Sequence, residues 1–348
     1  MSFLKKALIA MSGGVDSSVA AKIIQDKGYE CIGATMKLFS CGKSNSSDID
    51  DARAVAEKLN MEYFVFNFED EFKEKVIDKF IKTYSEGGTP NPCIDCNKHL
   101  KFGGLFAKAK ELDCDLIVTG HYADIRKING RFCLCKAADL KKDQSYVLYN
   151  LTKEMLEHIA FPLGSCSKEE ARKIALENGF VNASKKESQD ICFVPDGDYA
   201  AFIENYSGLK FPEGDFVDEG GNILGRHKGI IRYTIGQRKG LGLALPTPMY
   251  VKSKDPKNNT VTLCLNDDLF TDTVHVKDFN WVSIDNPHSS IRAAAKIRYN
   301  MTEAPCTVTP TDENGVVIKF DSPQRAVTKG QSAVVYDGDI VLGGGIIV

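Results

Sequence analysis

A glycine-rich loop near the N-terminus contains residue types that bind phosphate groups. It lies between a short apolar run, residues 7–11, and a helical stretch that ends at Gly28. Paired glycines let the backbone approach an anion, and a helix start directs free N–H groups and its positive dipole end towards it. The lysine of the usual phosphate loop is missing, and an ordinary strand–helix turn is the alternative. The predicted nucleotide-binding residues are Ala10, Met11, Ser12, Gly13, Gly14, Val15, Asp16 and Ser17.

Three of the eleven cysteines are candidates for chemistry. Cys93 and Cys96 form a Cys-x-x-Cys pair in a stiff loop with two prolines, close to an expected helix start, which would stabilise the Cys96 thiolate as a nucleophile. Such pairs also occur in redox, zinc and iron–sulfur sites, but no second pair follows at zinc-finger spacing. Cys192 alone indicates no chemistry and is a candidate only as the partner that Cys96 would need. Buried, inert cysteines are the alternative for all three.

A basic segment suggests contact with nucleic acid. Residues 226–254 include seven Lys or Arg and no Asp or Glu, with Tyr233 and Tyr250 interleaved. Residues 292–300 add three more basic side chains without acids. In a chain with a net charge of −3, this segregation is typical of a phosphate-backbone footprint, and a solvated basic face is the alternative.

Length and composition limit the class of protein. The 348 residues predict two or three domains, and 43% hydrophobic residues exclude wholesale disorder. No apolar run approaches the roughly 20 residues of a membrane span, and the N-terminus does not resemble a signal peptide, so we expect no membrane attachment. An odd number of scattered cysteines without an export signal indicates the cytoplasm, where thiols stay reduced.

Alternating strands and helices must position these residues. Strands expected at 7–11, 31–36, 63–68 and 116–119 are separated by helical stretches, which predicts parallel βαβ units and a doubly wound sheet. A hairpin is expected at Asn129-Gly130 because this dipeptide separates two apolar runs. Short strand-like runs from residue 273 to residue 348 predict a small β-barrel. Further helices are expected at 50–59, 72–84, 168–178 and 199–206.

Taken in order, these motifs resemble those of the tRNA-specific 2-thiouridylases, the MnmA or TrmU family. The glycine loop resembles the pyrophosphate-binding loop of the N-type ATP pyrophosphatases, the superfamily to which these enzymes belong. The similarity covers essentially the whole chain. Its other matching strings are residues 89–98, 119–122, 142–146, 191–193, 233–242, 298–299, 329–333 and 342–346.

The resemblance implies a fold and a reaction. The fold is a Rossmann-like α/β domain with a doubly wound parallel sheet (1–207), a small, mostly-β central domain (208–272) and a C-terminal β-barrel (273–348). The reaction replaces the C2 oxygen of the wobble uridine of tRNA by sulfur. ATP with Mg²⁺ would adenylate that oxygen and release pyrophosphate, and sulfur would then displace AMP. The implied partners are the tRNA anticodon loop and a sulfur donor such as a cysteine desulfurase or a sulfur-relay protein.

The family's roles carry over position by position. Met36 and Gly120 would bind the adenosine of ATP beside the glycine loop. Cys192 would carry a persulfide, and Cys96 would attack it, either freeing hydrogen sulfide or forming a disulfide after direct transfer. The residues that would contact tRNA are Asn91, Pro92 and Cys93, near the target base, together with His121, Lys142, Asp143, Gln144, Arg298, Tyr299 and Gln331.

Two features depart from the family's pattern. Cys93 stands where the family usually has an aspartate proposed to manage a proton near the base, so that role is unassigned, and Asp95 would point elsewhere. An alternative use is that Cys93, Cys96 and Cys192 hold three irons of an iron–sulfur cluster and leave the fourth open. We favour the persulfide route. The stretch after Met36 is also shorter than usual.

Two other functions compete with this one. Other ATP pyrophosphatases adenylate small molecules for amide or amine transfer, but they would need neither Cys96 and Cys192 nor the basic segment. A noncatalytic protein that binds tRNA or an iron–sulfur cluster would not need an intact ATP loop. Both are less favoured than tRNA thiolation.

Overall fold

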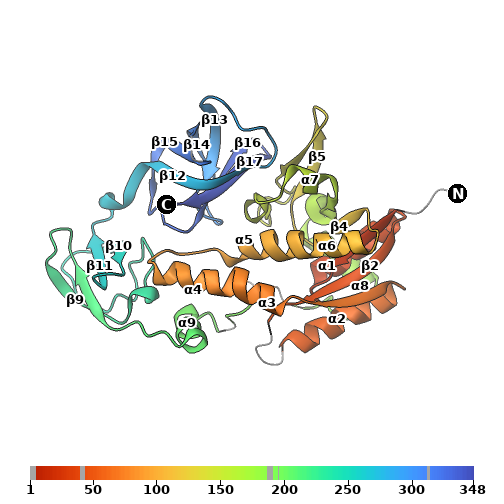
Figure 1. Cartoon of the computed structure of the whole chain (residues 1–348), viewed down its shortest axis with the longest axis horizontal. Helices are drawn as coiled ribbons and strands as arrows, with labels where there is room; N and C mark the ends of the chain where they lie inside the picture. Colours follow the sequence, from red (N-terminus) through yellow and green to blue (C-terminus); the bar gives the residue numbers. More distant parts are fainter. Residues whose placement is uncertain (1–4, 40–43, 186–190, 195, 312–313) are drawn as a thin grey trace.

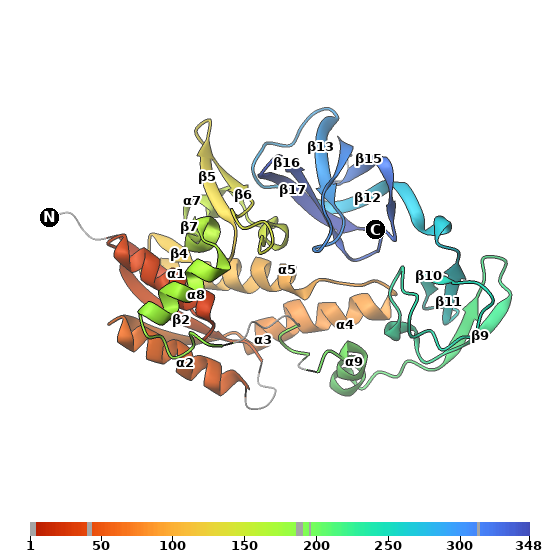
Figure 2. The same cartoon turned by 180° about the vertical axis from the view of Figure 1, so that it is seen from behind.

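The computed structural model describes residues 5–39, 44–185, 191–194, 196–311 and 314–348. Its three parts form an elongated molecule (Figures 1 and 2). An α/β part lies at one end and a small group of strands at the other, and a barrel rests above the helices that run between them. The predicted fold class is therefore confirmed, whereas the domain boundaries at 207/208 and 272/273 stay a prediction.

A five-stranded parallel sheet with the order β3-β2-β1-β4-β7 forms the α/β part. Ala7, Leu8 and Ile9 of β1 are completely buried, as expected for a strand covered on both faces. The chain order reverses at β1, and the carboxyl ends of strands at such a switch point form a ligand crevice. The strands are β1 (Lys6–Ala10), β2 (Glu30–Lys37), β3 (Glu62–Asn67), β4 (Leu116–Val118) and β7 (Ile159–Ala160).

Helices cover this sheet and also extend away from it. The helical segments of residues 69–85 and 92–111 lie side by side in both views (Figures 1 and 2). The first segment extends from the sheet to the vicinity of the central strands. No helix within the described ranges is both long enough and apolar enough to cross a membrane. The helices are α1 (Val15–Asp26), α2 (Ser44–Lys58), α3 (Glu69–Phe72), η1 (Lys73–Ile77), α4 (Asp78–Ser85), α5 (Pro92–Cys96), η2 (Asn97–Gly104), α6 (Leu105–Glu111), η3 (Ser145–Leu148), α7 (Lys153–Glu157), η4 (Pro162–Ser165), α8 (Lys168–Glu177) and α9 (Tyr199–Ser207).

The central part shares its core with the α/β part. Its four strands pair in the order β10-β11-β8-β9. Phe216 and Val251 of this sheet belong to the same buried cluster as Phe72, Phe80 and Tyr84 of the long helical segment. The elements are β8 (Gly214–Val217), β9 (Ile223–His227), η5 (Ile230–Arg232), β10 (Tyr250–Asp255), β11 (Thr260–Cys264) and η6 (Asp267–Leu269).

Six antiparallel strands form the C-terminal barrel, which is closed by pairing between β12 and β17. The hairpin predicted at Asn129-Gly130 is present, and it extends the barrel sheet because β6 pairs with β17 through Cys135 and Ile340. The sequence did not indicate this pairing. The strands are β5 (Asp124–Ile128), β6 (Arg131–Cys135), β12 (Phe270–Trp281), β13 (Ile291–Lys296), β14 (Ala304–Pro310), β15 (Val316–Arg325), β16 (Ser332–Asp337) and β17 (Ile340–Ile347).

All three parts meet at residues 87–89, which lead into α5. From the barrel, the carbonyl of Lys329 accepts from Thr89 N at 2.9 Å, and Gln331 Nε2 donates to the Thr89 carbonyl at 2.7 Å. From the central strands, Lys254 Nζ donates to the carbonyl of Gly88 at 3.3 Å. A side chain at Gly88 would stand 2.8 Å from Thr83 Cγ2, so the segment is confined on several sides.

Lys254 is a half-buried cation, and no acidic group is among the causes that shift its pKa. Its Nζ donates to the carbonyl of Tyr233 at 2.9 Å and lies 5.8 Å from the centre of the Tyr84 ring. Burial lowers the pKa of Lys254 to about 8. Because the unfolded chain keeps a pKa near 10.4, it binds more protons than the folded chain between these pH values, and stability rises with pH there.

We therefore expect Lys254→Met to remove a pH dependence. The free energy of unfolding of the wild type relative to the variant should rise by roughly 1–3 kcal/mol between pH 8 and pH 10.5, measured by urea denaturation. Lys252→Met is the matched control, because Lys252 lies on the same strand and pairs with Glu219 at the surface. A difference that stays constant with pH would show that Lys254 is not a desolvated cation in the folded chain.

Candidate active site

The glycine loop leads directly from β1 into α1. Gly13 has φ +71°, and a Cβ on it would stand 2.3 Å from the carbonyl oxygen of Asp48, so no other residue fits. Ser17 Oγ accepts from Ser12 N at 3.1 Å and donates to the Gly14 carbonyl at 3.1 Å. Gly14 precedes α1 without any side-chain cap in the described part of the chain. The first N–H groups of α1 therefore remain suited to an anion.

Asp16, in the first turn of α1, is held by two side chains from distant parts of the sequence. Lys168 Nζ lies 2.7 and 2.8 Å from its two carboxylate oxygens, and Tyr122 Oη donates to it at 3.0 Å. Only 9% of the Lys168 side chain is exposed. Sequence reasoning missed Lys168, because the residues around it indicate only the start of a helix: Ser167 and Glu170 form the capping box of α8.

A second group of side chains supports the back of the loop. Asn182 Nδ2 donates to the Gly13 carbonyl and to Ser18 Oγ, both at 3.0 Å. Lys185 Nζ donates to Gly13 at 3.3 Å and pairs with Asp48 at 2.7 Å and Asp51 at 2.6 Å. These residues were also missed, because they lie in a loop whose sequence has no phosphate-binding pattern.

The two predicted adenosine contacts lie at the carboxyl ends of β2 and β4, the two strands that flank β1. Met36 is half-buried near the end of β2. Gly120 follows β4, and a Cβ on it would stand 2.7 Å from both Asp16 C and Ser17 N. Glycine is thus required where this strand end packs on the start of α1. Part of the stretch that follows Met36, residues 40–43, lies outside the described residues.

The cysteine loop forms the short helix α5. Asn91 Oδ1 accepts from Cys93 N at 3.2 Å and caps the helix, and Pro92 occupies its first position. Cys93 is exposed near the start of α5, whereas Cys96 is buried at its end. Our expectation that a helix start stabilises the Cys96 thiolate is therefore wrong. Burial instead raises the pKa of the Cys96 thiol to about 12.

Cys192 comes close to both cysteines of α5. Besides burial, the thiols of Cys192 and Cys93 each raise the pKa of Cys96. The pKa of Cys192 is raised mainly by burial and, to a smaller extent, by the thiol of Cys93. The next residue, Phe193, anchors Cys192 by packing edge-on against Phe72 and Phe80, with ring centroids 5.7 and 5.2 Å apart. The preceding motif residues 188–190 lie outside the described residues.

Asp95 does not take the place of the aspartate that is absent at Cys93. It is buried, and its Oδ1 pairs with Lys79 Nζ at 2.6 Å, on the neighbouring helix α4. Asp95 therefore does not take over the acid–base role proposed for the aspartate that the family usually has at the position of Cys93.

His121 is buried between the loop and the thiols. Its Nδ1 lies 2.6 Å from Thr119 Oγ1, and its Nε2 lies 3.4 Å from Lys101 Nζ. Burial, followed by the charge of Lys101, lowers the pKa of His121 well below its ordinary value, so the ring is neutral. The charge of Lys101 in turn lowers the pKa of both Cys96 and Cys192. Sequence reasoning missed Lys101.

Most of the other residues predicted to contact tRNA also make internal hydrogen bonds. Asp143 accepts from Ala137 N and from Ser145, and Gln144 bonds both ways with the backbone of Tyr122. Arg298 donates to the carbonyls of Ile235 and Ala326 and to Thr328 Oγ1. These bonds organise the site, and contact with tRNA stays a prediction.

Tyr299 is the most clearly accessible of the predicted barrel contacts. It is 38% exposed, and its Oη donates to the Asp143 carbonyl at 3.1 Å. Burial raises the pKa of Tyr299 most, and the carboxylate of Asp143 and the thiol of Cys93 raise it further. The effect of Cys93 indicates that Tyr299 lies near this thiol. Lys142 is half-buried beside this loop. Gln331 holds Thr89, as described above.

The basic segment is less uniform in space than along the chain. Arg226 pairs with Asp215, and Arg232 with Glu204, each at 2.7 Å. Acidic side chains from other strands and helices therefore neutralise part of it. Arg238 and Lys239, at the tip of a central-part loop, are exposed.

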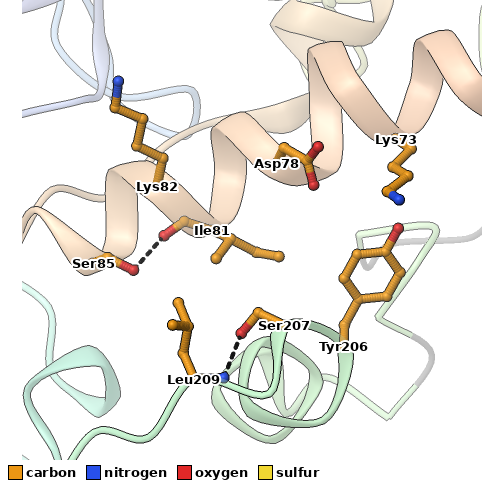
Figure 3. Close-up of a pocket in the computed structure, with 8 residues that line it drawn as sticks. All are labelled: Lys73, Asp78, Ile81, Lys82, Ser85, Tyr206, Ser207 and Leu209. Atoms are coloured by element: carbon orange, nitrogen blue, oxygen red, sulfur yellow. Dashed lines mark hydrogen bonds between the residues drawn. The ribbon is translucent and has the colours of Figure 1, made fainter.

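A cavity of about 740 Å³ lies between α4 and α9 (Figure 3). It contains none of the residues that the sequence predicts as site residues. The residues that line it are Lys73, Asp78, Ile81, Lys82, Ser85, Tyr206, Ser207 and Leu209.

A parallel sheet with a glycine loop and an uncapped helix start at its switch point defines a nucleotide-binding α/β protein of the HUP class. Family models match along the chain: a tRNA methyl transferase HUP domain at 5–196, a tRNA methyl transferase PRC-barrel domain at 200–265 and an aminomethyltransferase beta-barrel domain at 271–347. The chain belongs to the family of tRNA-specific 2-thiouridylases, the MnmA family.

Its relatives match over nearly their full lengths. The tRNA-specific 2-thiouridylase MnmA of Clostridioides difficile is 51% identical, with 99% of this chain and 98% of that protein covered. The enzyme of the same name from Acetivibrio thermocellus is 49% identical, with 99% of each covered. Among solved structures, a 4-thiouridine synthetase–RNA complex with bound ATP matches at 19% identity and a TM-score of 0.35, over 58% of this chain and 50% of that one. A similarity this low does not bear on function.

The geometry of Asp16 generates a prediction about the nucleotide site. Asp16→Ala should lower ATP cleavage to AMP and pyrophosphate by roughly 100-fold, because the variant loses the carboxylate that positions Lys168 beside the glycine loop and that suits a metal ion at the phosphates. tRNA affinity should change little, since the basic segment lies elsewhere in the chain. Pyrophosphate release and tRNA filter binding measure the two effects.

The control for this variant is Asp26→Asn, at the other end of α1, where the side chain pairs with Lys22 at the surface. It should leave both readouts unchanged. Normal pyrophosphate release by a folded Asp16→Ala protein would reduce Asp16 to a structural partner of Lys168.

Proposed function

We propose that the chain replaces the C2 oxygen of the wobble uridine of tRNA by sulfur, using ATP for activation and a cysteine persulfide as the sulfur carrier. One observation carries the proposal. Gly120 packs on the start of α1, and its neighbour His121 contacts Lys101, whose charge acts on the thiols of Cys96 and Cys192. Residues 119–121 thus connect a phosphate-binding element to a pair of thiols.

ATP is the nucleotide that this arrangement suits. The loop of residues 10–17 would hold its phosphates at the N–H groups of α1, and Met36 and Gly120 would border the adenosine. Mg²⁺ commonly binds through one or two carboxylates together with substrate phosphates. Asp16 is the carboxylate on this loop, and Lys168 and Tyr122 hold its orientation. Mg²⁺ would supply charge neutralisation as pyrophosphate departs.

The sulfur chemistry falls to the two cysteines. Cys192 would receive a terminal sulfur from a donor protein such as a cysteine desulfurase or a sulfur-relay protein, and its exposure suits such a transfer. The terminal sulfur would displace AMP from C2. The Cys96 thiolate would then attack Cys192 Sγ, leaving sulfur on the uridine and a Cys96–Cys192 disulfide that an external thiol reduces. In the other order, Cys96 attacks first and frees hydrogen sulfide.

The described residues give no support for an iron–sulfur cluster at the three cysteines. Among the described residues, no group of three Cys, His, Asp or Glu side chains is spaced to hold a metal ion. The proposed reaction therefore includes no step at iron.

The anticodon loop of tRNA is the proposed partner, and Asn91, Pro92 and Cys93 would border the target base. Tyr299, Lys142 and the exposed Arg238 and Lys239 are the side chains best placed for the RNA. An adenylating enzyme for small molecules would need neither thiol, and relatives that match over the whole chain do not favour it.

Mass analysis of tRNA tests this function directly. Purified protein with ATP, Mg²⁺, a cysteine desulfurase, cysteine and unmodified tRNA should convert the wobble uridine to a nucleoside in which one sulfur replaces one oxygen. Pyrophosphate release should depend on tRNA. Release stimulated by amino acids instead, or a wobble uridine that gains a methyl group, would refute the proposal.

The role of Cys93 gives a separate prediction. Because the persulfide route uses only Cys96 and Cys192, Cys93→Ala in iron-free protein should keep at least about half of the thiolation activity. Cys96→Ala and Cys192→Ala are the matched inactive controls. Activity that rises in proportion to bound iron in anaerobic protein, and that Cys93→Ala loses together with the iron, would overturn the persulfide route.

A further inference from the structure

Lys101 lies five residues after Cys96, a spacing that in an α-helix would put the two side chains about 140° apart. The chain here is not α-helical. Residues 97–104 form the π-helical segment η2, with Cys96 as its capping residue. Because hydrogen bonds in a π-helix join residues five apart, such residues lie on the same side of the helix. The π-helical turn therefore carries Lys101 to the side of the Cys96 thiol. Such turns frequently occur at functional sites.

A neutral histidine fixes the ammonium group of Lys101 in this position. An ammonium group only donates, so His121 Nε2 accepts from Lys101 Nζ, and Nδ1 carries the proton that it donates to Thr119 Oγ1. The ring is fixed further by Phe102 and Phe161, whose centroids both lie 5.9 Å away. A neutral ring orients the cation without cancelling its charge, which a carboxylate in the same place would do.

The other groups around Cys96 oppose its ionisation. Cys93, Asp95 and Cys192 each disfavour a negative charge there, and so does burial. Asp95 is itself paired with Lys79, which leaves Lys101 as the positive group that faces the thiol from η2. Lys101 also acts on Cys192, so one cation faces both sulfur atoms of the reaction.

We propose that Lys101 is a positioning residue for sulfur transfer: its ammonium group, held by neutral His121, stabilises the negative charge that Cys96 carries when it attacks Cys192. This proposal rests on the proposed function. In the step concerned, Cys96 loses its proton to solvent, its thiolate attacks Cys192 Sγ, and the Cys96–Cys192 bond forms as the bond from Cys192 to the transferred sulfur breaks. The electron pair leaves with that sulfur, whose new negative charge Lys101 also faces.

Alkylation of Cys96 by iodoacetamide tests the proposal without tRNA or ATP. The rate is followed against pH in the full-length protein, and tandem mass spectrometry separates Cys96 from the other cysteines. Lys101→Met should move the pH profile of Cys96 to higher pH by about one unit, which slows alkylation roughly tenfold at neutral pH. Lys101→Arg should restore most of the rate, since it keeps the charge.

Lys98→Met is the matched control, because Lys98 lies on the same helical segment and is exposed. It should leave the profile of Cys96 unchanged. His121→Gln provides a second variant if Lys101→Met fails to fold. It should give a smaller shift in the same direction, because the glutamine amide holds the ammonium group less firmly.

In the complete reaction, Lys101→Met should slow thiolation while tRNA-dependent pyrophosphate release continues. An unchanged pH profile of Cys96, or a loss of pyrophosphate release equal to the loss of thiolation, would overturn the role of Lys101. Failure of the wild-type protein to thiolate tRNA would instead refute the proposed function, and the alkylation result would stand apart from it.

Discussion

The burial of the Cys96 thiol is the constraint around which the site is organised. A buried thiol resists ionisation, and a pKa of about 12 leaves only a small ionised fraction of Cys96 at neutral pH. Such a nucleophile is protected from stray oxidants, but it can act only where a positive charge lies close by and where its sulfur partner is held in place. The structure meets the first need with Lys101, and the second with Phe193, which ties the residue after Cys192 into the aromatic core.

No single part of the molecule could hold this site alone. The segment that enters α5 is confined by a lysine from the central strands and by a glutamine and a backbone carbonyl from the barrel. Tyr146 and Tyr149, in the α/β part, bond to Ser332 of the barrel. The RNA surface proposed for the outer parts is thereby coupled to the geometry of the cysteine loop. Arg298 and Gln331 contribute to this connection, because Arg298 links the barrel to the carbonyl of Ile235 and Gln331 links it to the carbonyl of Thr89.

Much of the fold could be predicted from local patterns, and the features that were missed depend on distant contacts. The loop at Gly13 and the strands around it follow from periodicity and from glycine's access to positive φ. Nothing local predicts that Lys168 reaches Asp16 across 152 positions, or that Lys185 pairs with Asp48. The burial of Cys96 was missed for the same reason, since a helix start was expected to decide its chemistry. Lys101 was missed because it lies five residues after Cys96, and in an α-helix this spacing puts two side chains on different faces; only the π-helical turn brings them to the same side.

The short string that follows β4 joins the two halves of the proposed reaction. Gly120 must lack a side chain, because an added Cβ would stand 2.7 Å from the backbone of Asp16 and Ser17. Its neighbour His121 contacts Lys101 Nζ at 3.4 Å, and Thr119 Oγ1 lies 2.6 Å from the other ring nitrogen. Residues 119–121 thus connect the start of α1 to the ammonium group that faces the two thiols, so that both halves of the proposed reaction depend on the same three residues.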